Sequence, residues 1–180
     1  MVVFDTSVLA ISFDQAAAVP IDPSTGEPIT LCRTRIDYLL KNLAAVKARI
    51  LVPTPVVAEF MVMGGPDREK RLDLIASSKV FVVAPFDLRA AVECALIEER
   101  ESRSAFPSNE TKAKVKFDRQ ILATAIARGA TTIYTGDKQL ASRAKRCGLQ
   151  AIVTWELELP PAPPQSPQFD IVFPESPPAD

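Results

Sequence analysis

Short apolar runs alternate with longer amphipathic stretches along most of the chain. Five runs rich in β-branched or aromatic residues each predict a strand: they are residues 2–4, 49–52, 80–84, 131–134 and 150–154. Between the runs, apolar residues recur every three or four positions, which is typical of helices with one buried face. Strands that alternate with helices predict an α/β fold with a central, mostly parallel sheet of about five strands, flanked by helices.

Several residues mark where the predicted helices begin and end. Thr54 is expected to cap a helix with Pro55 in its first position, and Gly64 and Gly65 are expected to end it. Asp87 is expected to cap a long helix, whose buried face would carry Leu88, Ala91, Val92, Ala95 and Leu96.

The acidic side chains at positions 118 and 137 are each expected to lie at the start of a helix. The first of these helices would span 117–128, and the second would span 138–146. Residues 14–30, with three prolines and one glycine, are expected to form a loop, as is the polar segment 103–111.

The C-terminal end differs in composition from the rest of the chain. Half of the 16 prolines lie between Pro160 and Pro178. Such a segment buries too little apolar surface to offset its chain entropy. The organisation predicted is therefore one domain over residues 1–157, followed by a proline-rich, acidic and flexible tail over 158–180.

Net charge is unevenly distributed between these two parts. The formal net charge is −1, but five of the 22 acidic residues and no Lys or Arg lie in residues 156–180. Residues 1–155 therefore hold 17 acidic and all 21 basic residues, a net charge of +4. A mildly basic body is compatible with a nucleic-acid ligand.

The residue types that are missing exclude several mechanisms. The chain has no histidine, so it has no Ser-His-Asp triad and no histidine metal ligand. Its three cysteines, Cys32, Cys94 and Cys147, are far apart, which argues against a zinc site or a disulfide framework and suits a reducing cytoplasm. No signal peptide or membrane-spanning apolar run is apparent, so a cytoplasmic location is expected.

Four acidic residues stand where an open α/β sheet places its functional site. Asp5 and Asp137 each follow a predicted strand, Glu59 lies early in the helix after the second strand, and Asp118 precedes the fourth. Ligands in this architecture bind at the carboxyl ends of the strands. Each acid alone could be an ordinary cap, turn or surface residue, but four such coincidences are less probable than one shared site.

A cluster of carboxylates needs compensating cations, because like charges repel one another. Mg²⁺ and Mn²⁺ favour carboxylate and water ligands, and two such ions can support phosphodiester hydrolysis without a histidine. The predicted catalytic and metal-binding set is therefore Asp5, Glu59, Asp118 and Asp137.

Four segments in this order resemble the PIN-domain nucleases, particularly VapC-type toxins of toxin–antitoxin pairs. They are VFDTSVL at 3–9, PTPVVAEF at 53–60, FDRQILATA at 117–125 and IYTGDKQL at 133–140. The resemblance covers residues 1 to about 155. It implies a metal-dependent endoribonuclease that leaves 5′-phosphate and 3′-hydroxyl ends, with an antitoxin partner and a homodimeric state. It also implies that Thr6 or Thr135 orients the carboxylates, and we expect both threonines to belong to the substrate-binding set as well.

Two features depart from the family pattern: the loop at 14–30 is longer than in compact members, and the proline-rich tail has no counterpart.

The basic residues near the predicted site allow two interpretations. Lys112, Lys114 and Lys116 flank Asp118 and could contact substrate phosphates, or they could belong to a solvated loop. The cationic residues of the following helix are expected to form a solvated helix end, favourable to the helix dipole: Arg143, Lys145 and Arg146.

A non-catalytic module that binds RNA or protein through the same fold is the alternative function. A phosphotransfer domain is disfavoured, because no second aspartate lies two residues after Asp5, and no GxxxxGK motif indicates an NTPase.

Overall fold

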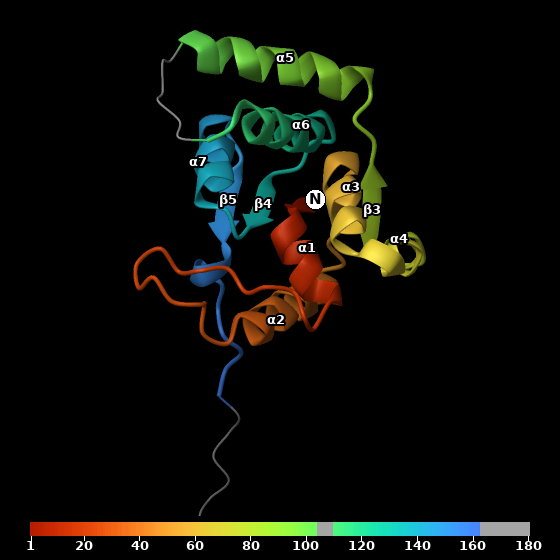
Figure 1. Ribbon diagram of the computed structural model, residues 1–180, viewed down its shortest axis with the longest axis vertical. Helices are drawn as coiled ribbons and strands as arrows, with labels where there is room; N and C mark the ends of the chain where they lie inside the picture. Colours follow the sequence, from red (N-terminus) through yellow and green to blue (C-terminus); the bar gives the residue numbers. More distant parts are fainter. Residues whose placement is uncertain (104–109, 163–180) are drawn as a thin grey trace, which may run out of the picture.

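The computed structural model describes residues 1–103 and 110–162 and contains one five-stranded parallel sheet (Figure 1). The strand order is β3-β2-β1-β4-β5. The strands are β1 (Val2–Phe4), β2 (Ile50–Pro53), β3 (Phe81–Ala84), β4 (Thr132–Thr135) and β5 (Gln150–Val153). Because every neighbouring pair is parallel, all five strands end at the same edge of the sheet. The predicted α/β fold is confirmed.

Helices cover both faces of this sheet. They are α1 (Thr6–Phe13), α2 (Cys32–Ala45), α3 (Thr54–Met63), α4 (Arg68–Ala76), α5 (Leu88–Arg103), α6 (Lys112–Ala127) and α7 (Lys138–Arg146), with short 3₁₀ turns at Gly65–Asp67 and Thr154–Glu156. Side chains of successive strand residues point to opposite faces. Val3 accordingly packs in one buried cluster with α3, α6 and α7, whereas Phe4 packs in the other with α2. Helix α1 contributes to both clusters.

Helix α6 begins earlier than expected, so the prediction that Asp118 starts this helix is wrong. The helix begins at Lys112, and the hydroxyl of Thr111 caps it by accepting a hydrogen bond from the Lys114 backbone N–H at 3.3 Å. Asp118 therefore lies in the second turn, where helical periodicity turns its side chain inward. The expected loop at 103–111 falls largely on residues 104–109, outside the described residues.

Thr54 does not cap α3, which corrects another prediction. The strand ends at Pro53, and Thr54 is already the first helical residue, so its side chain cannot act as the cap. Its hydroxyl instead accepts a hydrogen bond at 3.0 Å from the backbone N–H of Phe86, which follows β3. Pro55 is therefore the second helical residue and not the first, whereas Gly64 follows the last residue, as predicted.

The buried face of α5 also differs from the prediction. Asp87 caps the helix as expected, because its Oδ1 accepts from the Ala90 N–H at 3.0 Å. The residues packed inward, however, are Ala90 and Ile97. Helix α5 lies along α6 (Figure 1), and the larger Leu88, Val92 and Leu96 face outward, 81%, 54% and 39% exposed. We call these three residues the α5 stripe.

Two sequence predictions about the C-terminal part of the chain are not tested by the structure. The predicted flexible tail lies mostly in residues 163–180, beyond the described part, and the proposed domain boundary at residue 157 stays a prediction. Among the described helices, none is long and apolar enough to cross a membrane.

Candidate active site

The four acidic residues singled out from the sequence line one cavity of about 440 Å³ at the carboxyl ends of the strands. Asp5 follows β1 and Asp137 follows β4, while Glu59 and Asp118 project from α3 and α6. Thr6, Ser7, Lys114 and Phe117 also line this cavity, which we call the acid cavity. The parallel sheet thus brings together residues that lie up to 132 positions apart in the chain.

Asp5 lines the acid cavity with a buried carboxylate group that accepts several hydrogen bonds. Its Oδ1 accepts hydrogen bonds from the Val8 backbone N–H at 3.0 Å and from the Ser7 hydroxyl at 2.8 Å, and its Oδ2 accepts from the hydroxyl of Thr135. Burial raises the pKa of Asp5 above its ordinary value, although these hydrogen bonds oppose that effect. The Asp5 carboxylate is therefore fixed in position by three donors.

The turn between β4 and α7 approaches Ser7 closely, and this approach requires a glycine. The backbone N–H of Gly136 donates to the Ser7 hydroxyl at 2.8 Å. A Cβ atom at position 136 would lie 2.7 Å from that hydroxyl and 2.7 Å from Cγ of Pro20. Gly136 therefore lets the loop at 14–30 pack against the turn that carries Asp137.

Asp137 combines a structural role with its place in the acid cavity. As the cap of α7, its Oδ1 accepts from the backbone N–H groups of Gln139 at 2.7 Å and Leu140 at 3.2 Å. Its Oδ2 accepts from the ammonium group of Lys114 at 2.5 Å. Burial alone would raise the pKa of Asp137, but the bond from Lys114 and the two N–H groups outweigh it and lower the pKa.

Asp118 has the opposite electrostatic environment. Its side chain is buried, and this burial is the main cause that raises its pKa to about 7, against the attraction of Lys114. Its Oδ2 has no hydrogen-bond partner within the described ranges, and Nε of Arg143 lies 3.7 Å away. A buried carboxylate oxygen without a partner is costly and is often part of a functional site.

Glu59 lies at the exposed rim of the acid cavity, where the hydroxyl of Thr6 donates to its Oε2. Thr6 and Thr135 therefore each hold one carboxylate of the acidic set. The direct substrate contact that we predicted for these two threonines stays a prediction.

Arg143 is buried behind Asp118, so the prediction that it belongs to a solvated helix end is wrong. Only 5% of Arg143 is exposed, because its guanidinium group bonds Glu101 of α5 at 2.6 Å and Glu110 at 2.9 Å. Arg119 also bonds Glu101, at 2.7 Å. Lys145 and Arg146 are exposed, as expected.

This ionic network joins α5, α6 and α7, and nothing in the local sequence pattern indicated it. Ser7 was likewise not singled out, although it stands inside the motif that contains Asp5.

Of the three lysines near Asp118, only Lys114 is among the residues that line the acid cavity. It bonds Glu110 at 2.6 Å as well as Asp137. Lys112 and Lys116 are exposed on α6, and their predicted contact with phosphates stays untested.

The donor set fits a hard divalent cation such as Mg²⁺ or Mn²⁺, because all four acids offer carboxylate oxygens and Asp118 has one unpartnered oxygen. Among the described residues, however, no three candidate ligands are gathered tightly enough to form a finished metal site. Holding an ion therefore requires side chains around the acid cavity to move closer together.

An apolar groove of about 640 Å³ opens beside the acid cavity. It shares Thr6, Ser7, Glu59 and Phe117 with that cavity and adds Ala58, Val62 and Met63 from α3. Val62 and Met63 are 81% and 54% exposed, so apolar surface faces solvent next to the acids. We call this surface the α3 groove.

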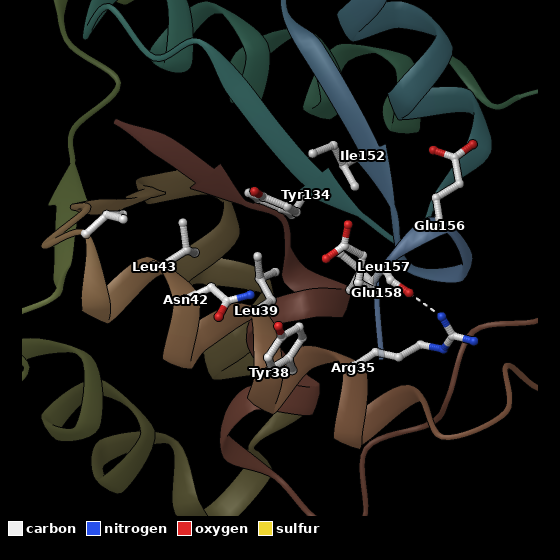
Figure 2. A pocket seen from close by; sticks show the side chains of 11 residues that line it. Arg35, Tyr38, Leu39, Asn42, Leu43, Tyr134, Ile152, Glu156, Leu157 and Glu158 are labelled. Atoms are coloured by element: carbon white, nitrogen blue, oxygen red, sulfur yellow. Dashed lines mark hydrogen bonds between the residues drawn. The ribbon is translucent and has the colours of Figure 1, made fainter. Parts of the chain in front are cut away.

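A separate cavity of about 390 Å³ lies between α2 and the segment after β5 (Figure 2). Tyr38, Leu39 and Tyr134 line it, and Arg35 reaches across to donate to the carbonyl oxygen of Leu157. None of the four acids lines this cavity, and the two carboxylates that do are Glu156 and Glu158. It is therefore distinct from the acid cavity.

Comparison with known proteins points to one family. The family model described as PIN domain matches residues 31–146, which is more than half of the chain and includes Glu59, Asp118 and Asp137 but not Asp5. A search of curated proteins finds no match.

Solved structures share the fold at low sequence identity. FitAB bound to an IR36 DNA fragment aligns with 20% identity and a TM-score of 0.55, over 88% of this chain and 98% of that one. VapBC2 from Rickettsia felis bound to a promoter DNA fragment aligns with 16% identity and a TM-score of 0.56, over 85% and 98%. DNA-bound VapBC from Salmonella typhimurium aligns with 14% identity and a TM-score of 0.53, over 85% and 97%.

Proposed function

Since the chain belongs to the PIN domain family, a family of nucleases, we propose that it is a metal-dependent endoribonuclease that hydrolyses RNA phosphodiester bonds. The observation that carries this proposal is the convergence of Asp5, Glu59, Asp118 and Asp137 on one cavity. An unpartnered, buried carboxylate oxygen at Asp118 adds to it, because such an oxygen calls for a cationic ligand.

In this proposal the four acids hold Mg²⁺ or Mn²⁺ and so orient the reacting phosphate. The chemistry that a bound divalent ion supplies is activation of a water molecule and stabilisation of the leaving oxygen. The chain contributes rigid positioning: Ser7, Val8 and Thr135 fix Asp5. Thr6 fixes Glu59 in the same way.

A nucleic-acid substrate suits the surface around the acid cavity. The α3 groove offers exposed apolar surface on which a nucleobase next to the scissile phosphate can stack. Lys112 and Lys116 are exposed on the helix that carries Asp118, where they can contact neighbouring phosphates. Family resemblance adds 5′-phosphate and 3′-hydroxyl products to this proposal, and the separated free cysteines add a cytoplasmic location.

We further propose that the nuclease is the toxin of a toxin–antitoxin pair and forms a homodimer. The structural neighbours FitAB and VapBC are described as complexes bound to DNA, which supports a protein partner here. A small adjacent reading frame with a DNA-binding head would support this assignment. The α5 stripe is one apolar surface on which a second copy could pack.

The experiment that tests the nuclease proposal compares cleavage of single-stranded RNA, single-stranded DNA and duplex DNA in Mn²⁺, Mg²⁺ and EDTA. The parent should cleave RNA only with a divalent ion. Asp5→Asn and Glu59→Gln each remove one carboxylate with little change in shape, and each should lower the rate at least about 100-fold, which corresponds to about 2.7 kcal/mol. Asp73→Asn is the matched control, because Asp73 is exposed on α4 and outside the acid cavity.

Three results would contradict the proposal. Equal cleavage in EDTA would exclude a metal-dependent reaction, and unchanged activity in Asp5→Asn would exclude the acid cavity as the site. Tight RNA binding without any cleavage would favour the alternative function, a non-catalytic binding module.

A further inference from the structure

Lys114 lies in the first turn of α6 and reaches into the acid cavity, where it bonds two carboxylates. Its ammonium nitrogen lies 2.6 Å from Oε1 of Glu110 and 2.5 Å from Oδ2 of Asp137. Both contacts are within the range of charge-assisted hydrogen bonds. The ammonium group of Lys114 therefore places a positive charge next to Asp137 in the acid cavity.

Glu110 holds Lys114 in this place, because Glu110 is itself anchored. Its Oε2 accepts from Arg143 at 2.9 Å, and Arg143 bonds Glu101 at 2.6 Å. Arg143 is buried, so this chain of ion pairs runs from the protein interior to the ammonium group. The position of Lys114 thus depends on ion pairs that form where α5, α6 and α7 pack together.

All three hydrogen-bond donors to Asp5 are neutral groups, whereas the negative charge of Asp137 is already paired with a cation. Oδ1 accepts two backbone N–H groups at the start of α7, and Oδ2 accepts from Lys114. Asp118 differs, because its buried Oδ2 has no hydrogen-bond partner in the described part of the chain. The acid cavity therefore has one side neutralised by an ammonium group, and another side with a buried carboxylate oxygen that accepts no hydrogen bond in the described part of the chain, although Nε of Arg143 lies 3.7 Å from it.

We propose that Lys114 replaces the second metal ion of this site, so that the chain binds a single divalent ion among Asp5, Glu59 and Asp118. This inference rests on the proposed nuclease function, and it narrows the metal-binding set of that proposal from four acids to three, because Asp137 is paired with Lys114. A lysine ammonium group has three N–H donors, and Glu110 and Asp137 occupy two of them. The third donor is left for a phosphate oxygen of the substrate, where a second ion would otherwise lie.

The experiment is a titration of each protein with Mn²⁺ alone, without RNA, by isothermal calorimetry. The parent should bind one ion per chain. Lys114→Met removes the cation that is paired with Asp137, so this variant should bind a second ion. Lys114→Arg keeps the positive charge and should bind one ion. Lys41→Met is the matched control, because Lys41 is exposed on α2, which contributes no residue to the acid cavity.

RNA cleavage by the same proteins supplies the second measurement. At Mn²⁺ concentrations that fill only one site, Lys114→Met should be at least about 30-fold slower, which is about 2 kcal/mol. Raising Mn²⁺ should restore part of this rate, because a second ion replaces the ammonium group. Lys114→Arg should stay within about fivefold of the parent, and Lys41→Met should be unchanged.

Two bound ions in the parent would overturn the proposal, as would one ion in Lys114→Met with unaltered affinity. Failure of the nuclease function itself is distinguishable. In that case the parent would cleave no RNA at any Mn²⁺ concentration, while the binding titration would still count the ions.

Discussion

The buried carboxyl group of Asp118 predicts a stability change that depends on pH. Its pKa in the folded protein is raised from 3.8 to about 7, chiefly by burial. Below pH 3.8 the group is protonated in both the folded and the unfolded chain, so folding carries no penalty. Between pH 3.8 and 7 the unfolded chain releases this proton while the folded chain still holds it, so the penalty grows with pH and applies in full above about pH 7.

The size of the penalty follows from the shift. The pKa differs by about three between the folded and unfolded chain, and each pKa unit corresponds to about 1.36 kcal/mol, which gives about 4 kcal/mol. Solvent screening reduces this value, because Asp118 lines an open cavity. We therefore expect the charged Asp118 to lower the free energy of unfolding by about 2 kcal/mol at pH 8 and by less than about 1 kcal/mol at pH 5. Arg143 keeps Glu101 and Glu110 as partners when Asp118 loses its charge, so no buried cation is left uncompensated.

Asp118→Asn should therefore be more stable than the parent in EDTA at pH 8, by about 2 kcal/mol or about 4–8 °C in Tm. Urea unfolding of both proteins at pH 5 and pH 8 measures the difference, which should shrink at the lower pH. The exposed Asp73→Asn should show no such dependence. A variant that is less stable than the parent at pH 8, or a difference equal at both pH values, would refute the reasoning.

Three further predictions concern the substrate, the oligomer and the support of Asp5. Changing both Lys112 and Lys116 to Ala should reduce the slope of log K for RNA binding against log salt concentration by about 1.4, because each phosphate contact on a single strand contributes about 0.7. An unchanged slope would show that both lysines are merely solvated. Leu96→Glu places a charge on the α5 stripe and should give monomers in light scattering, whereas a persistent dimer would place the interface elsewhere. Thr135→Val removes a donor to the buried Asp5 and should cost about 1–3 kcal/mol of stability in urea unfolding, and a loss below about 0.5 kcal/mol would contradict it.

The sheet was predictable because its strands are short, apolar and separated by amphipathic helices. The same pattern failed on α5, where Leu88, Val92 and Leu96 form an apolar face that turns outward. Periodicity shows that a helix has an apolar side, but it does not show which side packs on the domain. In α5 the inward side carries Ala90 and Ile97, both of which are buried.

The convergence of the four acids on one cavity was predictable from the order of the elements, whereas their counter-charges were not. A strand end fixes where its next residue lies, so Asp5 and Asp137 follow from the order of the elements. Glu101 and Glu110, by contrast, meet Arg143 only because α5, α6 and α7 pack together, and no sequence spacing encodes that meeting. The network determines how much of the negative charge of the acid cavity is compensated by cationic side chains, and the proposal that Lys114 replaces a second ion depends on this compensation.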